Sequence, residues 1–385
     1  MRVLFTAHGA YGHVQPLIGV ARALVSDGHD VLFATAADVG PLVASHGIDA
    51  VAAGMADEEL VAAARRTWPE ARSSPPATWT VRMFCEIAAP AVVQDLAPVI
   101  RRWRPDVIVR EEGEHGGPLA AAVAGLPWVT HGWGSPLPAP ESLVETGKLV
   151  APAWARAGLR APDGPAIYGA AVLDPCPPSL YAVQPPLQHR HVVRSWTPGA
   201  GMVVSQQRPH GRRLAYVGFG TVPLFRNPTE VLYVVVNSLL ALDFDVTVTA
   251  GSDEVVNQLR AIDGNRVRAE RWVDLPSLLQ ACDLVVCHGG AGTVLAALSA
   301  GLPVLLLPRG APSQLRMSMA CEARGVGRTV IWNRTSPAQL GDVLAELTSS
   351  SHARAAAAAL ASEVAGMPDP STGIAVLRGA IAKWR

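Results

Sequence analysis

Short, continuous runs of apolar residues alternate along this chain with segments whose apolar residues recur at helical spacing. Residues 14–25 show the second pattern, because Leu17, Val20 and Leu24 fall on one face of a helix. Apolar strands that alternate with helices are typical of a parallel sheet covered on both faces. In the first half, the predicted strands are residues 2–7, 31–36, 107–109 and 128–130, and a further helix is expected around residues 118–124.

The alternation stops between about residues 136 and 211, where Pro and Gly are frequent, and we expect an irregular loop region there. It then starts again, with predicted strands at residues 214–218, 245–250, 267–269, 284–287 and 303–307 and a helix at residues 228–242. The pattern therefore predicts an α/β protein with two Rossmann-like, doubly wound parallel-sheet domains that face each other across a cleft. Ligands of such sheets bind at the carboxyl ends of the strands.

Composition narrows the class of protein. The chain has 385 residues, of which 49% are hydrophobic and 17% charged, so a globular protein with more than one core is expected. The 32 basic and 32 acidic residues balance, which argues against a general binder of nucleic acid or anionic membranes. Five cysteines without a C-x-x-C pair argue against a disulfide framework or a structural zinc site. We also expect no signal peptide, no membrane span and a cytoplasmic location.

The segment "VVCHGGAGTVLAA", residues 285–297, contains the most suggestive turn. A predicted strand ends at Cys287, and a helix is expected from Ala291 onward. The unpaired N–H groups of a helix start, without side chains in the way, can bind an anion. A tight turn that uses glycine only for packing remains the alternative. The segment is neither a P-loop nor a G-x-G-x-x-G dinucleotide turn.

The surroundings of this turn resemble a known family. "RWVDLPSLLQACDLVVCHGGAGTVLAALSAGLPVLLLPRGAPSQ", residues 271–314, resembles the donor-binding signature of family 1 glycosyltransferases, which have the two-domain GT-B fold. "GAYGHVQPLIGVARAL", "YVGFGTV" and "DVIVREEGEHGGPLAAAVAGLPWV" resemble three further segments of that family, in the same order along the chain. The nearest likeness is to the actinobacterial enzymes that glycosylate secondary metabolites, and it spans most of the chain.

The resemblance implies a domain plan. Residues 1–195 would form the N-terminal acceptor-binding domain, 196–212 a linker, and 213–368 the C-terminal nucleotide-sugar-binding domain. Residues 369–385 would form a helix that packs back on the N-terminal domain.

The resemblance also implies a donor site in the second half. There the leaving diphosphate would be stabilised by a histidine and helix-start amides without a metal. Trp272 would stack on the nucleobase beside the backbone of Val273, although a core position for this tryptophan is the alternative. Ser313 stands where relatives carry an acidic residue that binds sugar hydroxyls, so a deoxysugar on dTDP is a suitable donor. The implied donor-binding residues are Thr221, Trp272, Val273, His288, Gly289, Gly290, Ala291, Gly292, Thr293 and Gln314.

His13 matches the general base of the family, and an imidazole suits that task at neutral pH. Glu111 aligns with the acidic partner of this base, where many relatives have Asp, and the neighbouring Glu112 and Glu114 are alternatives. The acceptor site is less readable. Phe84 and Trp133 are candidate acceptor-binding residues, whereas Trp68, Trp79 and Met83 are expected mostly to be core.

These observations predict a metal-independent, inverting glycosyltransferase with no cofactor. Its co-substrate would be a dTDP- or UDP-linked sugar, its acceptor a small hydrophobic aglycone, and its state a monomer or homodimer. Asp243 and Asp245 have metal-ligand spacing but lie at the start of a strand, at the end away from the expected site, so we interpret them as part of a turn. Two other classes remain open, a nucleotide-sugar epimerase of the same fold and a catalytically silent binding partner of another glycosyltransferase.

Overall fold

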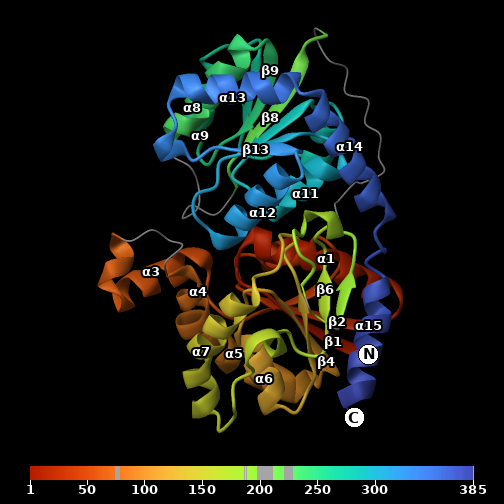
Figure 1. Cartoon of the computed structure of the whole chain (residues 1–385). Helices are drawn as coiled ribbons and strands as arrows, with labels where there is room; N and C mark the ends of the chain where they lie inside the picture. Colours follow the sequence, from red (N-terminus) through yellow and green to blue (C-terminus); the bar gives the residue numbers. More distant parts are fainter. Residues whose placement is uncertain (74–78, 186, 188, 197–210, 221–228, 385) are drawn as a thin grey trace. The chain divides into compact units, whose positions relative to one another are not determined.

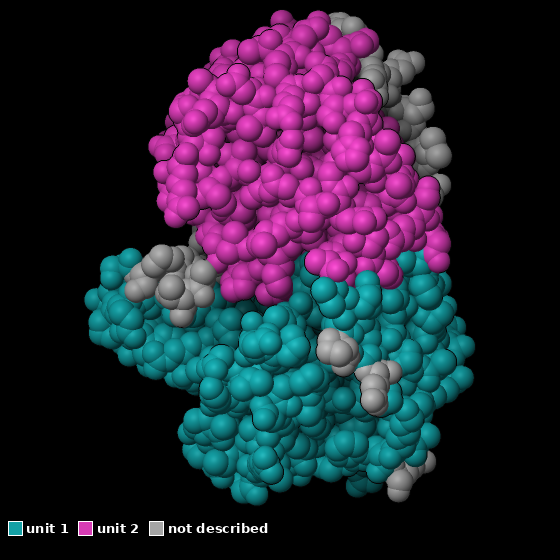
Figure 2. Space-filling view, in the orientation of Figure 1, with its two compact units in different colours: residues 1–176, 183–196, 367–385 teal, residues 177–182, 197–366 magenta. Residues whose placement is uncertain are grey.

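The chain folds into two compact units, which the computed structural model describes over residues 1–73, 79–185, 187, 189–196, 211–220 and 229–384 (Figure 1). Unit 1 comprises residues Met1–Cys176, Val183–Trp196 and Met367–Arg385, and unit 2 comprises residues Pro177–Ala182 and Thr197–Gly366 (Figure 2). Each unit is built around its own sheet.

The sheet of unit 1 has the strand order β3-β2-β1-β4-β5-β6-β7, and the described strands all pair in parallel. The expectation of a doubly wound parallel sheet is thereby confirmed for this half. Its strands are β1 (Arg2–Thr6), β2 (Asp30–Thr35), β3 (Asp49–Ala52), β4 (Val107–Glu111), β5 (Trp128–His131), β6 (Val172–Asp174) and β7 (Arg190–Val192).

Helices from both ends of the chain cover this sheet. α1 and α15 contribute Leu17, Ile18 and Leu377 to the same core as Phe5 and Val109 of the central strands. Helix α15 packs against α1 and against the strands β4 and β5. The helices are α1 (Tyr11–Ser26), α2 (Gly40–Ala44), α3 (Asp57–Thr67), α4 (Thr80–Met83), α5 (Ala89–Trp103), α6 (Gly116–Val123), α7 (Pro140–Arg156) and α15 (Thr372–Trp384). Shorter helical turns are η1 (Pro69–Arg72), η3 (Phe84–Ala88) and η4 (Gly164–Tyr168).

The expected irregular region begins instead with a helix of 17 residues, α7. Pro140 occupies its first position, where proline is tolerated. Leu143, Val150 and Trp154 are buried, and the helix packs against η4. The prediction of a loop is therefore wrong for this part of residues 136–211, because buried apolar side chains outweigh the helix-breaking composition.

Helices α4 and α5, with the π-helical turn η3 between them, form one continuous segment, Thr80–Trp103. By length and composition it is the one helix of the described ranges that is long and apolar enough to cross a membrane. However, α5 buries Val92, Leu96 and Ile100 and packs against α6, so we interpret the segment as a core helix.

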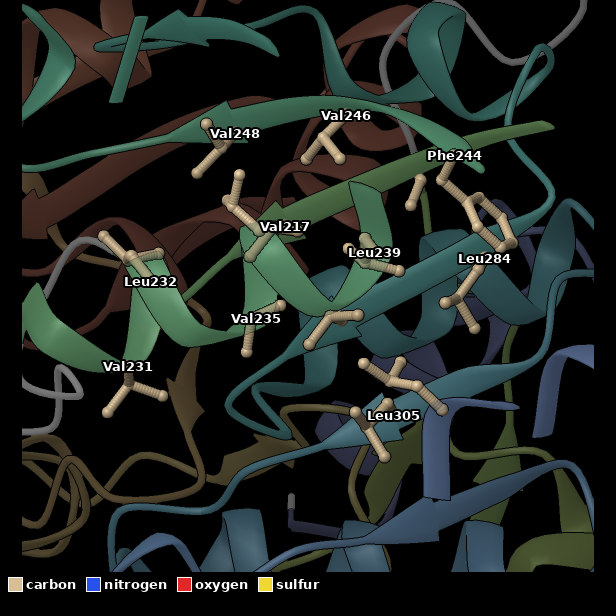
Figure 3. Close-up of a cluster of buried hydrophobic side chains, with 14 of the residues drawn as sticks. Val217, Val231, Leu232, Val235, Leu239, Phe244, Val246, Val248, Leu284 and Leu305 are labelled. Carbon is tan, nitrogen blue, oxygen red and sulfur yellow. The ribbon is translucent and has the colours of Figure 1, made fainter. Parts of the chain in front are cut away.

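Unit 2 contains a parallel sheet of the order β10-β9-β8-β11-β12-β13. Figure 3 shows how side chains of α8, such as Val235 and Leu239, face strand residues such as Val217 and Leu305. The strands are β8 (Arg213–Gly218), β9 (Phe244–Thr249), β10 (Val267–Glu270), β11 (Leu284–Cys287), β12 (Val304–Leu306) and β13 (Gly327–Thr329). The helices are α8 (Thr229–Ala241), α9 (Asp253–Arg260), α10 (Leu275–Leu279), α11 (Ala291–Ser299), α12 (Pro312–Ala323), α13 (Pro337–Ser349) and α14 (Ser351–Gly366), with the turns η5 (Pro178–Leu180) and η7 (Trp332–Arg334).

Candidate active site

Polar side chains of unit 1 gather where its central strands end. Glu111 is the last residue of β4, His8 lies two residues beyond β1, and Trp133 lies two residues beyond β5. His13 lies in the first turn of α1. Because the strands are parallel, their carboxyl ends bring these residues to one edge of the sheet.

The Nδ1 atom of His13 lies 2.7 Å from Oε1 of Glu111. Glu111 is fully buried, whereas 19% of the His13 side chain is exposed. A carboxylate only accepts hydrogen bonds, so Nδ1 carries a proton, and in the neutral ring Nε2 keeps its lone pair. Of the three glutamates considered, the fold therefore brings Glu111 to His13.

The other two glutamates have different partners. Glu114 accepts hydrogen bonds from the Thr6 hydroxyl at 2.6 Å and from the backbone N–H groups of Gly116 and Gly117 at the start of α6. Glu112 accepts a long contact of 3.5 Å from the backbone N–H of Trp133. These contacts hold Glu114 against β1 and α6 and place Glu112 beside the segment after β5.

The His13–Glu111 pair is strongly polarised. Burial alone would raise the pKa of the Glu111 carboxyl, but the charge and hydrogen bond of His13, with the Gly113 N–H and His8, lower it to about 2. Burial likewise acts to lower the pKa of His13, yet the charge and hydrogen bond of Glu111 outweigh burial and raise that pKa above its usual value. Glu111 is therefore ionised at neutral pH, and its charge increases the basicity of His13.

A buried arginine, which sequence reasoning missed, forms hydrogen bonds with the loop after β4. Arg110 is fully buried within β4, and its guanidinium donates to the carbonyls of Glu112 at 2.6 Å, Glu114 at 3.1 Å and Ile167 at 3.2 Å. Its Nε donates to the Thr130 hydroxyl at 2.9 Å. The sequence does show a charged residue inside an otherwise apolar strand. Because a buried charge needs hydrogen-bonding partners, this position could have been singled out.

His8 is the second residue that sequence reasoning missed. Its Nε2 lies 3.0 Å from the carbonyl oxygen of Gly113, and its ring stacks on Phe84 at a centroid distance of 4.3 Å. Burial lowers the pKa of His8 to about 4. The ring is therefore neutral at pH 7 and donates from Nε2 to Gly113. His8 could have been singled out from the sequence because it follows the end of the first predicted strand.

The candidate acceptor residues surround the His13 ring. The rings of Phe84 and Trp133 meet it edge-to-face at centroid distances of 5.6 Å and 5.1 Å. Trp68, Trp79 and Met83 are buried, in agreement with the expectation that they are mostly core.

In unit 2, the glycine turn connects β11 to α11. Gly290 is the N-cap of α11, and the first intrahelical bond is donated by Val294 to the Gly290 carbonyl. The N–H groups of Ala291, Gly292 and Thr293 therefore belong to the unpaired first turn of the helix. The predicted strand 284–287 and the helix start at Ala291 are both confirmed.

Gly290 of this turn and Gly220, which follows β8, leave room for the His288 ring. A Cβ atom at Gly290 would lie 2.5 Å from His288 Nε2, and one at Gly220 would lie 2.7 Å from Cε1 of the same ring. Gly290 has a φ of −65°, which any residue can adopt, whereas Gly289 has a φ of +82°, in the left-handed region that favours glycine. A glycine at position 290 therefore makes space for the imidazole ring and is not required by the backbone conformation.

Burial lowers the pKa of His288 to about 4, partly countered by the backbone of Gly218. The unliganded ring is therefore neutral at pH 7. A neutral imidazole can still donate a ring N–H to an anionic ligand, and such a hydrogen bond is charge-assisted.

The remaining donor candidates are less closely grouped. Trp272 lies just beyond β10 and is 68% exposed, which excludes the core alternative, and Val273 follows it half-buried. Gln314 is buried in α12, and its side-chain oxygen accepts a 2.9 Å hydrogen bond from the Arg309 N–H. Thr221 lies outside the described residues.

No group of three or more His, Cys, Asp or Glu side chains in the part of the chain described by the structure could hold a metal ion. Asp243 lies in a turn with φ +60° and pairs with Arg266 at 3.2 Å. Asp245 lies within β9, so the interpretation of both residues as a turn is wrong for Asp245. All five cysteines are free and buried.

The chain contains two Rossmann-like parallel sheets. A His–Glu pair lies at the edge of one sheet, and a glycine-rich helix start lies at the edge of the other. This combination defines the class of GT-B glycosyltransferases. Residues 22–184 match the N-terminal domain, and residues 233–378 the C-terminal domain, of the family described as erythromycin biosynthesis protein CIII-like. The chain belongs to this family of actinobacterial natural-product glycosyltransferases.

Relatives and solved structures agree. The chain is 29% identical to the L-demethylnoviosyl transferase of Streptomyces niveus, over 100% of this chain and 99% of that protein. It is 31% identical to the elloramycin glycosyltransferase ElmGT of Streptomyces olivaceus, over 85% of each. The structure of SsfS6 from Streptomyces sp. SF2575, complexed with thymidine diphosphate, is similar with a TM-score of 0.79 and 26% identity, covering 98% of this chain and 99% of that one.

Proposed function

We propose that this glycosyltransferase moves a sugar, with inversion at the anomeric carbon, from a dTDP- or UDP-sugar to a hydrophobic natural-product aglycone. The observation that carries the proposal is the 2.7 Å contact between His13 and the buried, ionised Glu111. A histidine whose Nδ1 is held by an anion has its Nε2 free to accept a proton. The surrounding aromatic rings of Phe84 and Trp133 suit a flat, apolar acceptor.

In this mechanism, Nε2 of His13 takes the proton of the acceptor hydroxyl. The acceptor oxygen then attacks the anomeric carbon from the face opposite the diphosphate, and the bond between that carbon and the diphosphate oxygen breaks. Glu111 stabilises the imidazolium that forms. The diphosphate takes the electron pair of the broken bond and is stabilised by the N–H groups at the start of α11 and by His288.

A dTDP-linked deoxysugar is the donor that we favour. SsfS6, at 26% identity, was crystallised with thymidine diphosphate, and the demethylnoviosyl transferase is named for its sugar. In this chain Ser313 begins the Ser-Gln pair at the start of α12, where an acidic residue would otherwise bind sugar hydroxyls. A sugar with fewer hydroxyls needs that acid less.

Incubation with a panel of dTDP- and UDP-sugars and aromatic or macrolide aglycones, followed by mass spectrometry, tests the proposal. A product heavier than the aglycone by one sugar residue supports it. Conversion of the nucleotide-sugar to its epimer without transfer would indicate an epimerase. Release of neither product, together with activation of another glycosyltransferase, would indicate a silent binding partner.

Gly290→Ala is expected to weaken thymidine diphosphate binding roughly 10- to 100-fold, about the contribution of one hydrogen bond to a charged group. The new methyl group would occupy the position of the His288 ring and force it to turn. In a His288→Ala background the same substitution should cost nothing further. Calorimetric titration of thymidine diphosphate measures both affinities.

Gly341→Ala is the matched control, because nothing lies within 4 Å of a Cβ atom at that helical position. A further loss of affinity in the double variant would show that the ligand itself approaches the Gly290 backbone. Equal affinity of all variants would remove the glycine turn from the donor site.

Activity is expected to survive EDTA, because the proposed diphosphate site uses a helix start and a neutral histidine in place of a cation. Turnover of the active donor–acceptor pair should remain within twofold after dialysis against EDTA and should not rise on addition of Mg²⁺ or Mn²⁺. Loss of activity in EDTA that is restored by either ion would contradict the proposed site.

A further inference from the structure

The Glu111 carboxylate is held on both of its oxygens. Oε1 contacts His13, whereas Oε2 accepts the Gly113 N–H at 2.5 Å and the indole N–H of Trp133 at 2.6 Å. A buried carboxylate that accepts several N–H groups has a fixed orientation, because rotation would leave a donor and a lone pair without partners. The hydrogen bonds to Oε2 therefore determine that Oε1 is the oxygen that faces His13.

Trp133 reaches this position because residue 113 has no side chain. A Cβ atom at Gly113 would lie 2.6 Å from Cζ2 of the Trp133 indole. The carbonyl of Gly113 accepts from His8 on its other side at 3.0 Å. His8, Gly113 and Trp133 thus form one continuous support for the carboxylate, contributed by the loops after β1, β4 and β5.

We propose that Trp133 is a positioning residue of the His13–Glu111 pair: its indole N–H and the Gly113 N–H together orient the carboxylate so that Oε1 faces His13. This inference rests on the proposed function and adds a second task to a tryptophan first considered only as a wall of the acceptor site. A residue that only lined the acceptor site would need its ring and not its N–H group.

The Trp133→Phe substitution separates the two tasks, because it keeps an aromatic ring and removes the N–H group. Turnover should fall roughly 10- to 100-fold, as expected for loss of a hydrogen bond to a charged group, while the KM for the acceptor changes less than threefold. In a Glu111→Ala background, where there is no carboxylate to orient, Trp133→Phe should change turnover less than twofold. An equal loss in both backgrounds, or a change confined to KM, would overturn the inference.

Histidine NMR titration provides a readout that needs no substrate. The His13 pKa should fall in Trp133→Phe, because the partner that raises this pKa is no longer held in place while burial still lowers it. In ¹⁵N-tryptophan spectra, the indole signal that disappears in Trp133→Phe should also be the signal that shifts most in Glu111→Gln.

Trp384→Phe is the matched control, since it removes an indole N–H that donates to the Gly125 carbonyl at 2.8 Å. The pKa of His13 should not change in this variant. A His13 pKa that stays at or above its wild-type value in Trp133→Phe would overturn the inference even if sugar transfer is demonstrated. Absence of sugar transfer with the expected NMR result would instead count against the proposed function alone.

Discussion

The His13→Ala enzyme is expected to turn over roughly 10²- to 10⁴-fold more slowly than the wild type, which is the usual contribution of a general base. Without the imidazole, no side chain held by Glu111 remains to accept the acceptor proton. Thymidine diphosphate should bind with unchanged affinity, because its proposed residues belong to unit 2 and His13 belongs to unit 1. Initial rates of product formation and calorimetric titration measure the two quantities.

The pH dependence provides a second check of the same residue. Activity requires neutral His13, so it is lost as the pH falls through the pKa of His13, which lies above its usual 6.5. The acid limb of kcat/KM should therefore lie above pH 6.5. His189→Ala removes an exposed histidine of unit 1 and is the control. Turnover of His13→Ala within a few-fold of that control would exclude His13 as the base.

Arg110→Met is expected to lower the free energy of unfolding of unit 1 by about 3–5 kcal/mol, the usual cost of removing one partner from a buried ionic network. The substitution keeps most of the side-chain length but leaves the carbonyls of Glu112, Glu114 and Ile167 without their donor. It also leaves Glu111 and Glu114 buried without the nearby positive charge.

Urea denaturation followed by tryptophan fluorescence measures this effect, because most of the tryptophans belong to unit 1. Lys148→Met is the control: Lys148 is exposed and pairs with Glu145 at 2.6 Å on the surface of unit 1, so its loss should cost no more than about 1 kcal/mol. Similar midpoints for the two variants would mean that water replaces the Arg110 guanidinium without penalty.

Much of the fold was readable from the sequence because local signals and global packing agree in its core. The strand β11 and the start of α11 lie where the apolar run and the glycine turn predict them. Helix α7 was missed because Pro152 and Gly147 lie within it. Gly147 is not a helix breaker there: a Cβ atom would lie 3.1 Å from the carbonyl oxygen of Pro162, so the glycine permits close packing.

The candidate site was only partly predictable. His13 and Glu111 were found through a family resemblance, and the structure brings them together. The contacts of Trp133 and His8 with the Glu111 loop depend on which strand ends lie side by side, and a linear sequence does not contain that information. Arg110 carries a sequence signal, but its acceptors are carbonyl oxygens, which every residue has, so no pattern of residue types reveals them.

Helix α15 determines how these enzymes can be recombined. It belongs to unit 1, where Gly373 packs on Val20 of α1 and Arg378 pairs with Asp27 at 3.2 Å. A chimera that exchanged everything after Trp196 would therefore place a foreign α15 against the native α1. Exchange of unit 2 needs two crossovers instead, one after Trp196 and one before Met367, so that both ends of the chain come from the same parent.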